Sequence, residues 1–384
     1  MTTRAYKYKK QNLNVRESEL SFRINGMFTA SSRVASVVAV VLGFLTATLL
    51  LMAIGRNPSG MYRALLQVIS GFDSGRGTWN VRYTGEWLVV SIPLILCALS
   101  MGFAARSGLF NLGAEGQYIA GLTAAQITAI FFPPVPVLHM AAAVCAAMLA
   151  GALWGGIAGF IKARFQVSEV IATIMLNYIA LYLHRIIIFR IPGSGAFRTV
   201  DFPVTASLSS SMLSFLTNGS RLNYGLWFTV AAVVIYRIIL EKTAFGFSLR
   251  AAGFNREAAR YAGIRVKLNI TAAMMIAGVF AGLAGACVSL GVFNYGRILS
   301  SFDNYGFEGI AAALVGNCTG TGIAVTGLIF GILKSAQPLM HARQIPGEIT
   351  LIIMALVVVF LSLRPAMQMF AEWRMKRQRL KEVR

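Results

Sequence analysis

The sequence predicts an all-α, polytopic membrane protein: a helical bundle of eight full spans plus a broken or re-entrant pair, up to ten crossings in all, with both termini cytoplasmic. Hydrophobic residues make up 57% of the 384 residues and charged residues only 13%, whereas soluble domains average about 45–50% and 25%. Apolar windows of about 20 residues, the length that crosses a bilayer, lie at 34–55, 87–105, 108–131, 137–161, 169–190, 223–240, 268–291 and 348–363.

The basic residues orient these spans. Of the 35 Lys and Arg residues, 20 lie in three segments beside apolar spans, namely 1–33, 241–267 and 364–384. This is the positive-inside pattern. It predicts that the net charge of +21 faces the cytoplasmic side of an inner or plasma membrane and contacts membrane lipid, not nucleic acid. The first span follows about 30 polar and basic residues, so we expect no cleavable signal.

Counting spans gives the topology. From an inside N-terminus, six spans return the chain to the cytoplasm at 241–267, and a seventh leads out. The basic tail must also be inside, so the apolar stretch 305–337 is expected to form two short crossings or a re-entrant hairpin that bends at "GNCTGTG". The segments 56–86, 133–136 and 191–222 are then outside.

Three regions follow from this count. We expect a cytoplasmic basic arm at 1–33, a transmembrane domain at 34–363 that contains a cytoplasmic loop at 241–267, and a cytoplasmic basic tail at 364–384.

Within the inside loop, "GFNREAARYAG" reads as a short surface helix. Asn255 is a suitable N-cap and Gly263 a suitable terminating residue. Phe254, Ala258 and Tyr261 share one apolar stripe, whereas two arginines, at 256 and 260, lie on another face. A simpler interpretation is that the loop is only a positively charged anchor.

The spacing Glu-Ala-Ala-x-x-x-Gly in "EAARYAG" resembles the cytoplasmic coupling motif of ABC-importer permeases. Other stretches extend the resemblance over roughly residues 85–335: "GLFNLGAEGQYIAG", "SEVIATIMLNYIALYL", "AGVFAGLAGA" and "YGFEGIAAALVGN". Together they look like the branched-chain amino acid and simple-sugar group of these permeases, and within it the nucleoside-uptake branch. The sequence "GNCTGTGI" departs from the more usual Asn-Pro-containing turn of the group.

This resemblance implies that the loop helix docks on a separate ATPase subunit. The implied ATPase-coupling residues are Arg250, Asn255, Arg256, Glu257, Ala258, Ala259, Arg260 and Gly263. It also implies a second permease subunit, with a heterodimer preferred over a homodimer, and an extracytoplasmic substrate-binding lipoprotein. The chain has no G-x-x-x-x-G-K-[ST] motif, so ATP and Mg²⁺ are expected on the partner ATPase and no cofactor on this chain.

Polar side chains inside predicted spans are candidates for the substrate pathway, because such groups are costly in a bilayer. Asn111, Glu115 and Gln117 cluster among three glycines, which favour a broken helix. Equally, Glu115 could pair with an arginine or with backbone amides and join two helices. The predicted pathway residues are Phe110, Asn111, Glu115, Gln117, Asn177 and Glu308, with Tyr178 and Phe307 as further flat surfaces. Asp303 lies near a membrane edge, where we expect a loop residue.

The function expected from this pattern is an ABC permease for a nucleoside or a related ribose-containing solute, without enzymatic activity of its own. The alternatives are a permease for a simple sugar and, from another class, an ion-coupled secondary transporter. An intramembrane enzyme is less well supported, because no nucleophile and base stand together. The three histidines and four scattered cysteines show no metal-ligand spacing.

Overall fold

The computed structural model describes residues 39–73, 75 and 77–362. The predicted basic arm, the first residues of the first span and the basic tail lie outside the described residues. The described apolar segments form helices whose bounds are Ala39–Ala53, α2 Ser59–Ser70, α3 Arg82–Arg106, α4 Ala114–Phe131, α5 Leu138–Phe165, α6 Glu169–Phe189, α7 Ser211–Leu216, α8 Gly225–Lys242, α9 Ala244–Phe254, α10 Arg256–Tyr261, α11 Val266–Gly291, α12 Tyr305–Val315, α13 Gly320–His341 and α14 Ile349–Ser362.

Strands are few and short in the described residues. The pairs are β1 Phe72–Asp73 with β2 Thr78–Trp79, and β3 Arg198–Asp201 with β4 Tyr295–Arg297, both antiparallel. The second pair ties the long loop after α6 to the segment after α11. A single 3-10 turn, Val204–Ala206, lies in the same loop.

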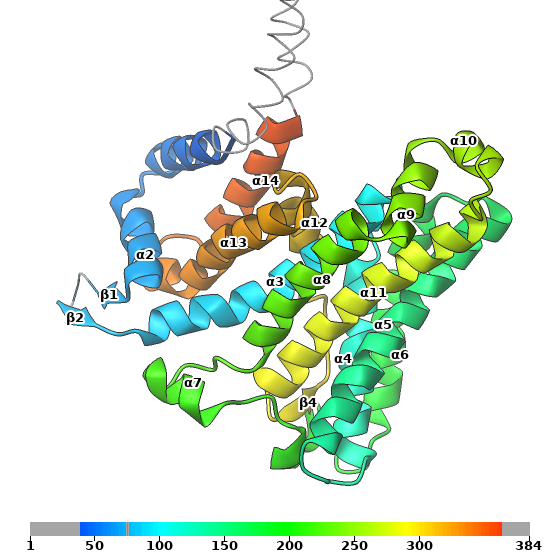
Figure 1. The fold of residues 1–384 in the computed structure, drawn as a ribbon. Helices are drawn as coiled ribbons and strands as arrows, with labels where there is room; N and C mark the ends of the chain where they lie inside the picture. The colour runs from blue at the N-terminus through cyan, green and yellow to red at the C-terminus, as the bar shows by residue number, and fades with distance from the viewer. Residues whose placement is uncertain (1–38, 74, 76, 363–384) are drawn as a thin grey trace, which may run out of the picture.

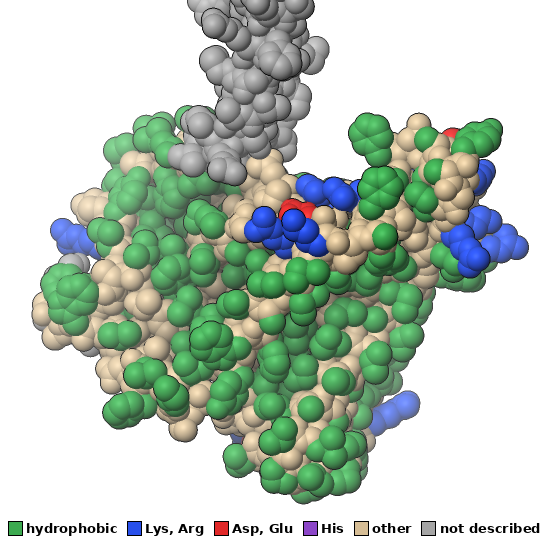
Figure 2. Space-filling view, viewed as in Figure 1, with side chains coloured by type: hydrophobic (Ala, Val, Ile, Leu, Met, Phe, Trp, Pro, Cys, Tyr) green, Lys and Arg blue, Asp and Glu red, His purple; other side chains and the backbone are tan. Residues whose placement is uncertain are grey.

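Two helices form the centre of the bundle. In α3 and α11, 83% of the most apolar stretch is buried, compared with 44% in α5 and 39% in α6. In Figure 1, α4, α5 and α6 pack on one side of this centre and α12, α13 and α14 on the other. The outer helices expose large apolar side chains over their remaining faces, as Figure 2 shows. Such a surface suits lipid and not water.

The helix lengths agree with a multi-pass membrane protein. Five helices, α3, α5, α6, α11 and α13, are long and apolar enough to cross a bilayer. The helices α4 and α8 have 18 residues each, or about 27 Å at 1.5 Å per residue. All eight predicted windows overlap a helix, but the window 108–131 is helical only from Ala114.

Glycines set the close crossing of α5 and α11. A Cβ atom on Gly278 would overlap the carbonyl of Gly151, and one on Gly282 would overlap the carbonyl of Ala147. Small residues at four-residue spacing allow this approach of two backbones. The spacing is therefore a packing feature.

The apolar stretch 305–337 is broken, as the sequence predicts, but only its first part is short: α12 has 11 residues, whereas α13 has 22 and is long enough to cross a bilayer. α12 ends at Val315 and α13 begins at Gly320, with Asn317 and Cys318 in left-handed conformations between them. The freed carbonyl of Cys318 accepts a hydrogen bond from Tyr236 Oη at 2.7 Å, so the bend leaves that backbone group satisfied inside the bundle.

Candidate functional site

The loop between α8 and α11 carries two consecutive helices, α9 and α10. Asn255 separates them: its backbone N–H donates to the carbonyl of Ala251 at the end of α9, and its side-chain Oδ1 accepts from the backbone N–H groups of Glu257 at 3.1 Å and Ala258 at 3.0 Å at the start of α10. This confirms the predicted N-cap. The sequence did not predict α9 as a helix, although its cap Thr243, which accepts from Gly246 N at 2.9 Å, fits the usual pattern.

Gly263 terminates α10, also as predicted. Its φ is +79°, a left-handed conformation that glycine adopts without cost. The N–H of Ile264 donates to the carbonyl of Ala259, and the N–H of Gly263 donates to that of Arg260, both at 3.0 Å. This pair of bonds is a Schellman motif, so both ends of the short helix are fixed by local sequence.

The outer face of α10 has no partner among the described residues. Phe254 is 96% exposed and Tyr261 93% exposed, whereas Ala259 turns inward and is only 3% exposed. Glu257 and Arg260 form an exposed ion pair at 3.6 Å. Arg250 donates weakly to the Gly246 carbonyl at 3.4 Å, and the side chain of Arg256 is also exposed. Two large aromatic residues beside exposed charges are typical of a docking surface.

α9 packs directly on the central helices. A Cβ atom on Gly253 would overlap the backbone of Ser107 and Gly108, just after α3. Asn269 of α11 donates to Ser248 Oγ of α9 at 3.2 Å. α10 follows α9 directly in the chain. A force applied to α10 can therefore reach α3 through the contact at Gly253 and α11 through the hydrogen bond at Ser248.

The segment between α3 and α4 forms a buried polar cluster. Asn111 Nδ2 donates to Ser100 Oγ and to Gln117 Oε1, both at 3.0 Å, and Ser100 Oγ donates to Gln117 Oε1 at the same distance. Asn111 is 0% exposed and Gln117 1% exposed. The predicted pathway residues Asn111 and Gln117 therefore bond to each other in the interior of the helix bundle.

Glu115 and Asn177 tie the start of α4 to two other helices, α12 and α6. The Glu115 carboxylate accepts from the backbone N–H of Asn304 at 2.9 Å and of Gly306 at 2.6 Å. Asn177 accepts from Gly116 N at 2.8 Å and donates to the carbonyl of Leu112 at 2.9 Å. Both side chains are buried. The Asn177 bonds satisfy backbone groups of the break, whereas the Glu115 bonds cap the N-terminal end of α12 and join it to α4. This corresponds to the pairing with backbone amides considered for Glu115.

The remaining predicted pathway residues lie nearer the surface. Phe110 is 37% exposed. Glu308 forms an ion pair with Lys334 of α13 at 2.7 Å, and the Lys334 ammonium lies 4.2 Å from the centroid of the Tyr305 ring. Sequence reasoning missed Lys334, although a single lysine in an apolar helix is itself a signal.

Three aromatic side chains, those of Tyr178, Phe302 and Phe307, form a row, and two of them are close to Glu308 in the sequence. The rings of Tyr178 and Phe302 are 5.2 Å apart, and those of Phe302 and Phe307 are 5.7 Å apart, both edge to face. Tyr178 and Phe307 remain 49% and 38% exposed. Tyr178 and Phe307, the two further aromatic residues considered from the sequence, are thus connected through the ring of Phe302.

The sequence also did not reveal the contacts of Asp303. Its carboxylate forms an ion pair with Arg297 and accepts a hydrogen bond from Tyr118 Oη at 2.8 Å. Only 17% of the Asp303 side chain is exposed. The signal was absent from the sequence because the three residues come from three separate elements.

Two of the three histidines have ordinary hydrogen-bond partners. His184 Nδ1 lies 2.8 Å from Thr123 Oγ1, and His139 Nδ1 lies 2.9 Å from Thr205 Oγ1. Within the described residues, no three His, Cys, Asp or Glu side chains come close enough to hold a metal ion.

The apolar outer faces and the helices of bilayer length define a multi-pass membrane protein. The chain belongs to the family of permease components of branched-chain amino acid transport systems, whose model matches residues 83–362. It is a pore-forming component and not an enzyme.

Three curated relatives are similar over most of their length. The guanosine ABC transporter permease protein NupP of Bacillus subtilis (strain 168) is 38% identical, over 85% of this chain and 92% of the relative. The nucleoside ABC transporter permease protein NupB of Lactococcus lactis subsp. cremoris (strain MG1363) is 36% identical, over 85% and 90%. The glucose ABC transporter permease protein TsgB13 of Haloferax volcanii is 33% identical, over 72% and 75%.

Proposed function

We propose that this chain forms the translocation pathway of an ATP-driven importer that carries ribonucleosides across the cell membrane. The observation that carries the proposal is the similarity, over most of the chain, to permeases named for guanosine and nucleosides. Helix α10 also supports the proposal, because it offers a partner ATPase an exposed surface whose two ends are fixed by the caps at Asn255 and Gly263.

A permease component works with an ATPase and a substrate-binding protein. In this proposal α10 and the basic ends of the helices face the cytoplasm, where the ATPase docks on Phe254, Tyr261 and the residues of the Glu-Ala-Ala motif. α11 runs for 26 residues from this end to β4, about 39 Å at 1.5 Å per residue. The binding protein then delivers substrate at the β4 end, which is extracytoplasmic.

Transport follows from alternating access, in which two arrangements of the same helices open one pathway to opposite sides. ATP binding to the partner changes which arrangement is favoured, and it can do so only through contacts that differ between the two. The contact of α9 with the end of α3 supplies such a route. A second permease subunit, different in sequence, completes the pathway.

The six predicted pathway residues have two roles in this proposal. Phe110 reaches the surface and faces the solute, whereas Glu308 is largely buried and positions Lys334 through their ion pair. The buried residues Asn111, Glu115, Gln117 and Asn177 position the break between α3 and α4 that borders the pathway.

A simple-sugar importer is the second candidate, favoured by the similarity to a glucose permease. Both candidates need the partner ATPase, whereas an ion-coupled transporter would not.

The test is uptake of radiolabelled guanosine, uridine, D-ribose and D-glucose by proteoliposomes that contain the complete complex. We expect ATP-dependent uptake of the nucleosides, and none when the ATPase subunit is omitted. Uptake of glucose or ribose alone would replace the nucleoside assignment with the sugar one. Uptake by the permease without an ATPase would contradict both.

A further inference from the structure

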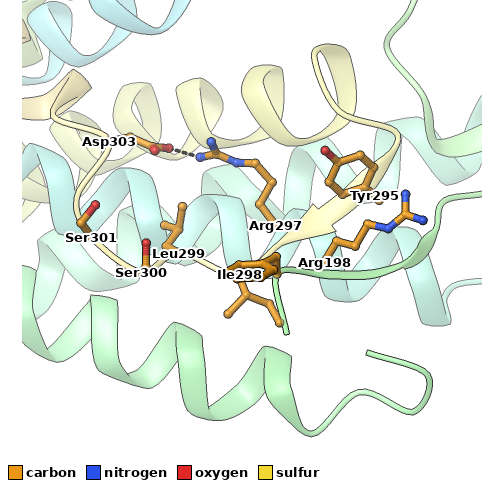
Figure 3. A pocket seen from close by; sticks show the side chains of 9 residues that line it. Arg198, Tyr295, Arg297, Ile298, Leu299, Ser300, Ser301 and Asp303 are labelled. Atoms are coloured by element: carbon orange, nitrogen blue, oxygen red, sulfur yellow. Dashed lines mark hydrogen bonds and ion pairs between the residues drawn. The ribbon is translucent and has the colours of Figure 1, made fainter. Parts of the chain in front are cut away.

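A pocket of about 230 Å³ opens beside β4 at the end of α11 that is remote from α10. It is lined by residues of β3, β4 and the segment that leads to α12. Figure 3 shows Asp303 and Arg297 pointing toward one another at one side of it, with Tyr295 and Arg198 at the other. The pocket is smaller than the roughly 300–1,000 Å³ of ordinary ligand sites. It therefore suits one part of a nucleoside, such as the sugar.

One oxygen of the Asp303 carboxylate is bonded to neighbouring side chains, and the other is available to a ligand. Its Oδ2 accepts from Tyr118 Oη at 2.8 Å and pairs with Arg297 Nη2. Its Oδ1 accepts no hydrogen bond from the described residues. A carboxylate held in this way is fixed in direction and still has an acceptor oxygen for a ligand that donates hydrogen bonds.

The Arg297 side chain is itself held in place. Its guanidinium lies 4.6 Å from the centroid of the Phe293 ring, and its backbone carbonyl is 3.1 Å from His184 Nε2. Partial burial of an ion pair costs desolvation energy and gives little stability in return. The pair at Arg297 and Asp303 is therefore better explained by a role in binding than by a role in folding.

The rim of the pocket carries an unpartnered aromatic side chain. Phe197, which precedes β3, lines the pocket and is 81% exposed. Its backbone carbonyl accepts from Ile298 N at 3.1 Å, so the main chain is fixed while the ring is free. Base–aromatic stacking needs only such an open ring face. Arg198 stacks on the Tyr295 ring at 5.4 Å and adds hydrogen-bond donors at the same rim.

We propose that this pocket is a ribonucleoside subsite at the extracytoplasmic mouth of the pathway, in which Asp303 Oδ1 accepts hydrogen bonds from the ribose 2′,3′-diol and Phe197 stacks on the base. The proposal rests on the proposed nucleoside function and adds a specificity rule to it. A 2′-deoxynucleoside lacks one of the two donors and binds more weakly here. The distinction between ribo- and deoxyribonucleosides is therefore made partly in the permease and not only in the binding protein.

The experiment measures ligand binding to the complete transporter in nanodiscs without the binding protein, by ligand-observed NMR titration. The ligands are guanosine, 2′-deoxyguanosine and D-ribose. In the unmodified complex we expect guanosine to bind about tenfold more tightly than 2′-deoxyguanosine, as loss of a hydrogen bond to a charged group predicts. In Asp303→Asn this ratio falls toward one, because the anionic acceptor is gone.

Phe197→Ala provides an independent test that does not disturb the buried ion pair. It should weaken both nucleosides by at least fivefold, from lost stacking, and leave D-ribose binding unchanged. The matched control is Phe215→Ala on α7, a phenylalanine that is 86% exposed and lies outside the pocket. It should bind all three ligands as the unmodified complex does.

The outcomes separate this inference from the proposed function. If guanosine is imported but the unmodified complex binds both nucleosides equally, or if Phe197→Ala and Phe215→Ala behave alike, the subsite is wrong and the function stands. If no nucleoside is imported while D-ribose binding still depends on Asp303, the nucleoside assignment is wrong and the pocket recognises a sugar.

Discussion

The α10 region and the break between α3 and α4 use the same residue types in opposite ways. Asn255 and Gly263 fix the ends of an exposed helix with bonds to their immediate neighbours. Asn111, Glu115 and Asn177 are buried and bond to groups that are distant in the chain or on other helices. The ends of α10 are therefore fixed by its own sequence, whereas the break is fixed by contacts with the rest of the chain.

This contrast predicts how the two regions respond to mutation. Changes in the break should reduce the stability of the fold and affect transport only through it. Changes in α10 should reduce coupling to the ATPase and leave the fold intact. The three predictions below test this separation, from the largest expected effect to the smallest.

Glu115→Ala should have the largest effect. It leaves the backbone N–H group of the buried residue Gly306, and that of the more exposed Asn304, without an acceptor. At about 1–3 kcal/mol for an unsatisfied buried group, the free energy of unfolding should fall by at least that amount. Thermal unfolding of the purified protein in nanodiscs measures this loss.

Glu115→Gln is the graded control, since its amide oxygen can replace only one carboxylate oxygen and should retain part of the stability. Glu257→Ala is the exposed control and should unfold like the unmodified protein. If Glu115→Ala keeps its stability but changes substrate-stimulated ATP hydrolysis, Glu115 lines the pathway and the contrast between the regions fails.

How far the sequence predicts the structure follows from the same contrast. The α10 caps depend on residues within a few positions of one another, so the spacing of Asn255 and Gly263 was sufficient to place them. The membrane helices were predictable because apolar windows of bilayer length are a local property. The bend between α12 and α13 was predictable from the polar and small residues of "GNCTGTG" for the same reason.

The sequence could not show which polar residues face a cavity. Asn177 is 65 positions from Leu112, whose carbonyl accepts its hydrogen bond, and Asp303 meets Tyr118 only because α4 lies beside the start of α12. Such contacts depend on helix packing and not on local pattern. This is why the sequence did not show that these predicted pathway residues are buried, or that the loop residue Asp303 contacts Tyr118 and Arg297.

Gly263→Val should have an intermediate effect, and on coupling more than on folding. No atom lies within 4 Å of a Cβ built at Gly263, but its φ is +79°, which costs a β-branched residue about 1–2 kcal/mol or more. The Schellman motif should open and α10 should lose its fixed end. We expect nucleoside uptake to be lost while the amount of protein in the membrane is unchanged, measured by transport assay and immunoblot.

Gly263→Asn is the matched control, because asparagine tolerates the left-handed conformation better than other residues, and it should keep most of the uptake. Glu257→Arg tests the same surface by reversing one exposed charge and should also abolish uptake. Full uptake in both Gly263→Val and Glu257→Arg would show that the α10 surface does not transmit force from the ATPase.

Arg260→Gln should have the smallest effect on the fold. Its ion pair with Glu257 is exposed at both side chains and spans 3.6 Å, and pairs of this kind contribute about 0–1 kcal/mol. Unfolding should therefore be unchanged within error, whereas affinity for the ATPase should fall modestly, by a few fold, and more at low salt than at high salt because the lost contact is a screened surface charge. Binding of the ATPase to nanodisc-embedded protein at two ionic strengths measures this. A loss of stability without a change in ATPase affinity would mean that Arg260 supports α10 from within, and the surface attributed to the partner would then be limited to Phe254, Tyr261 and Glu257.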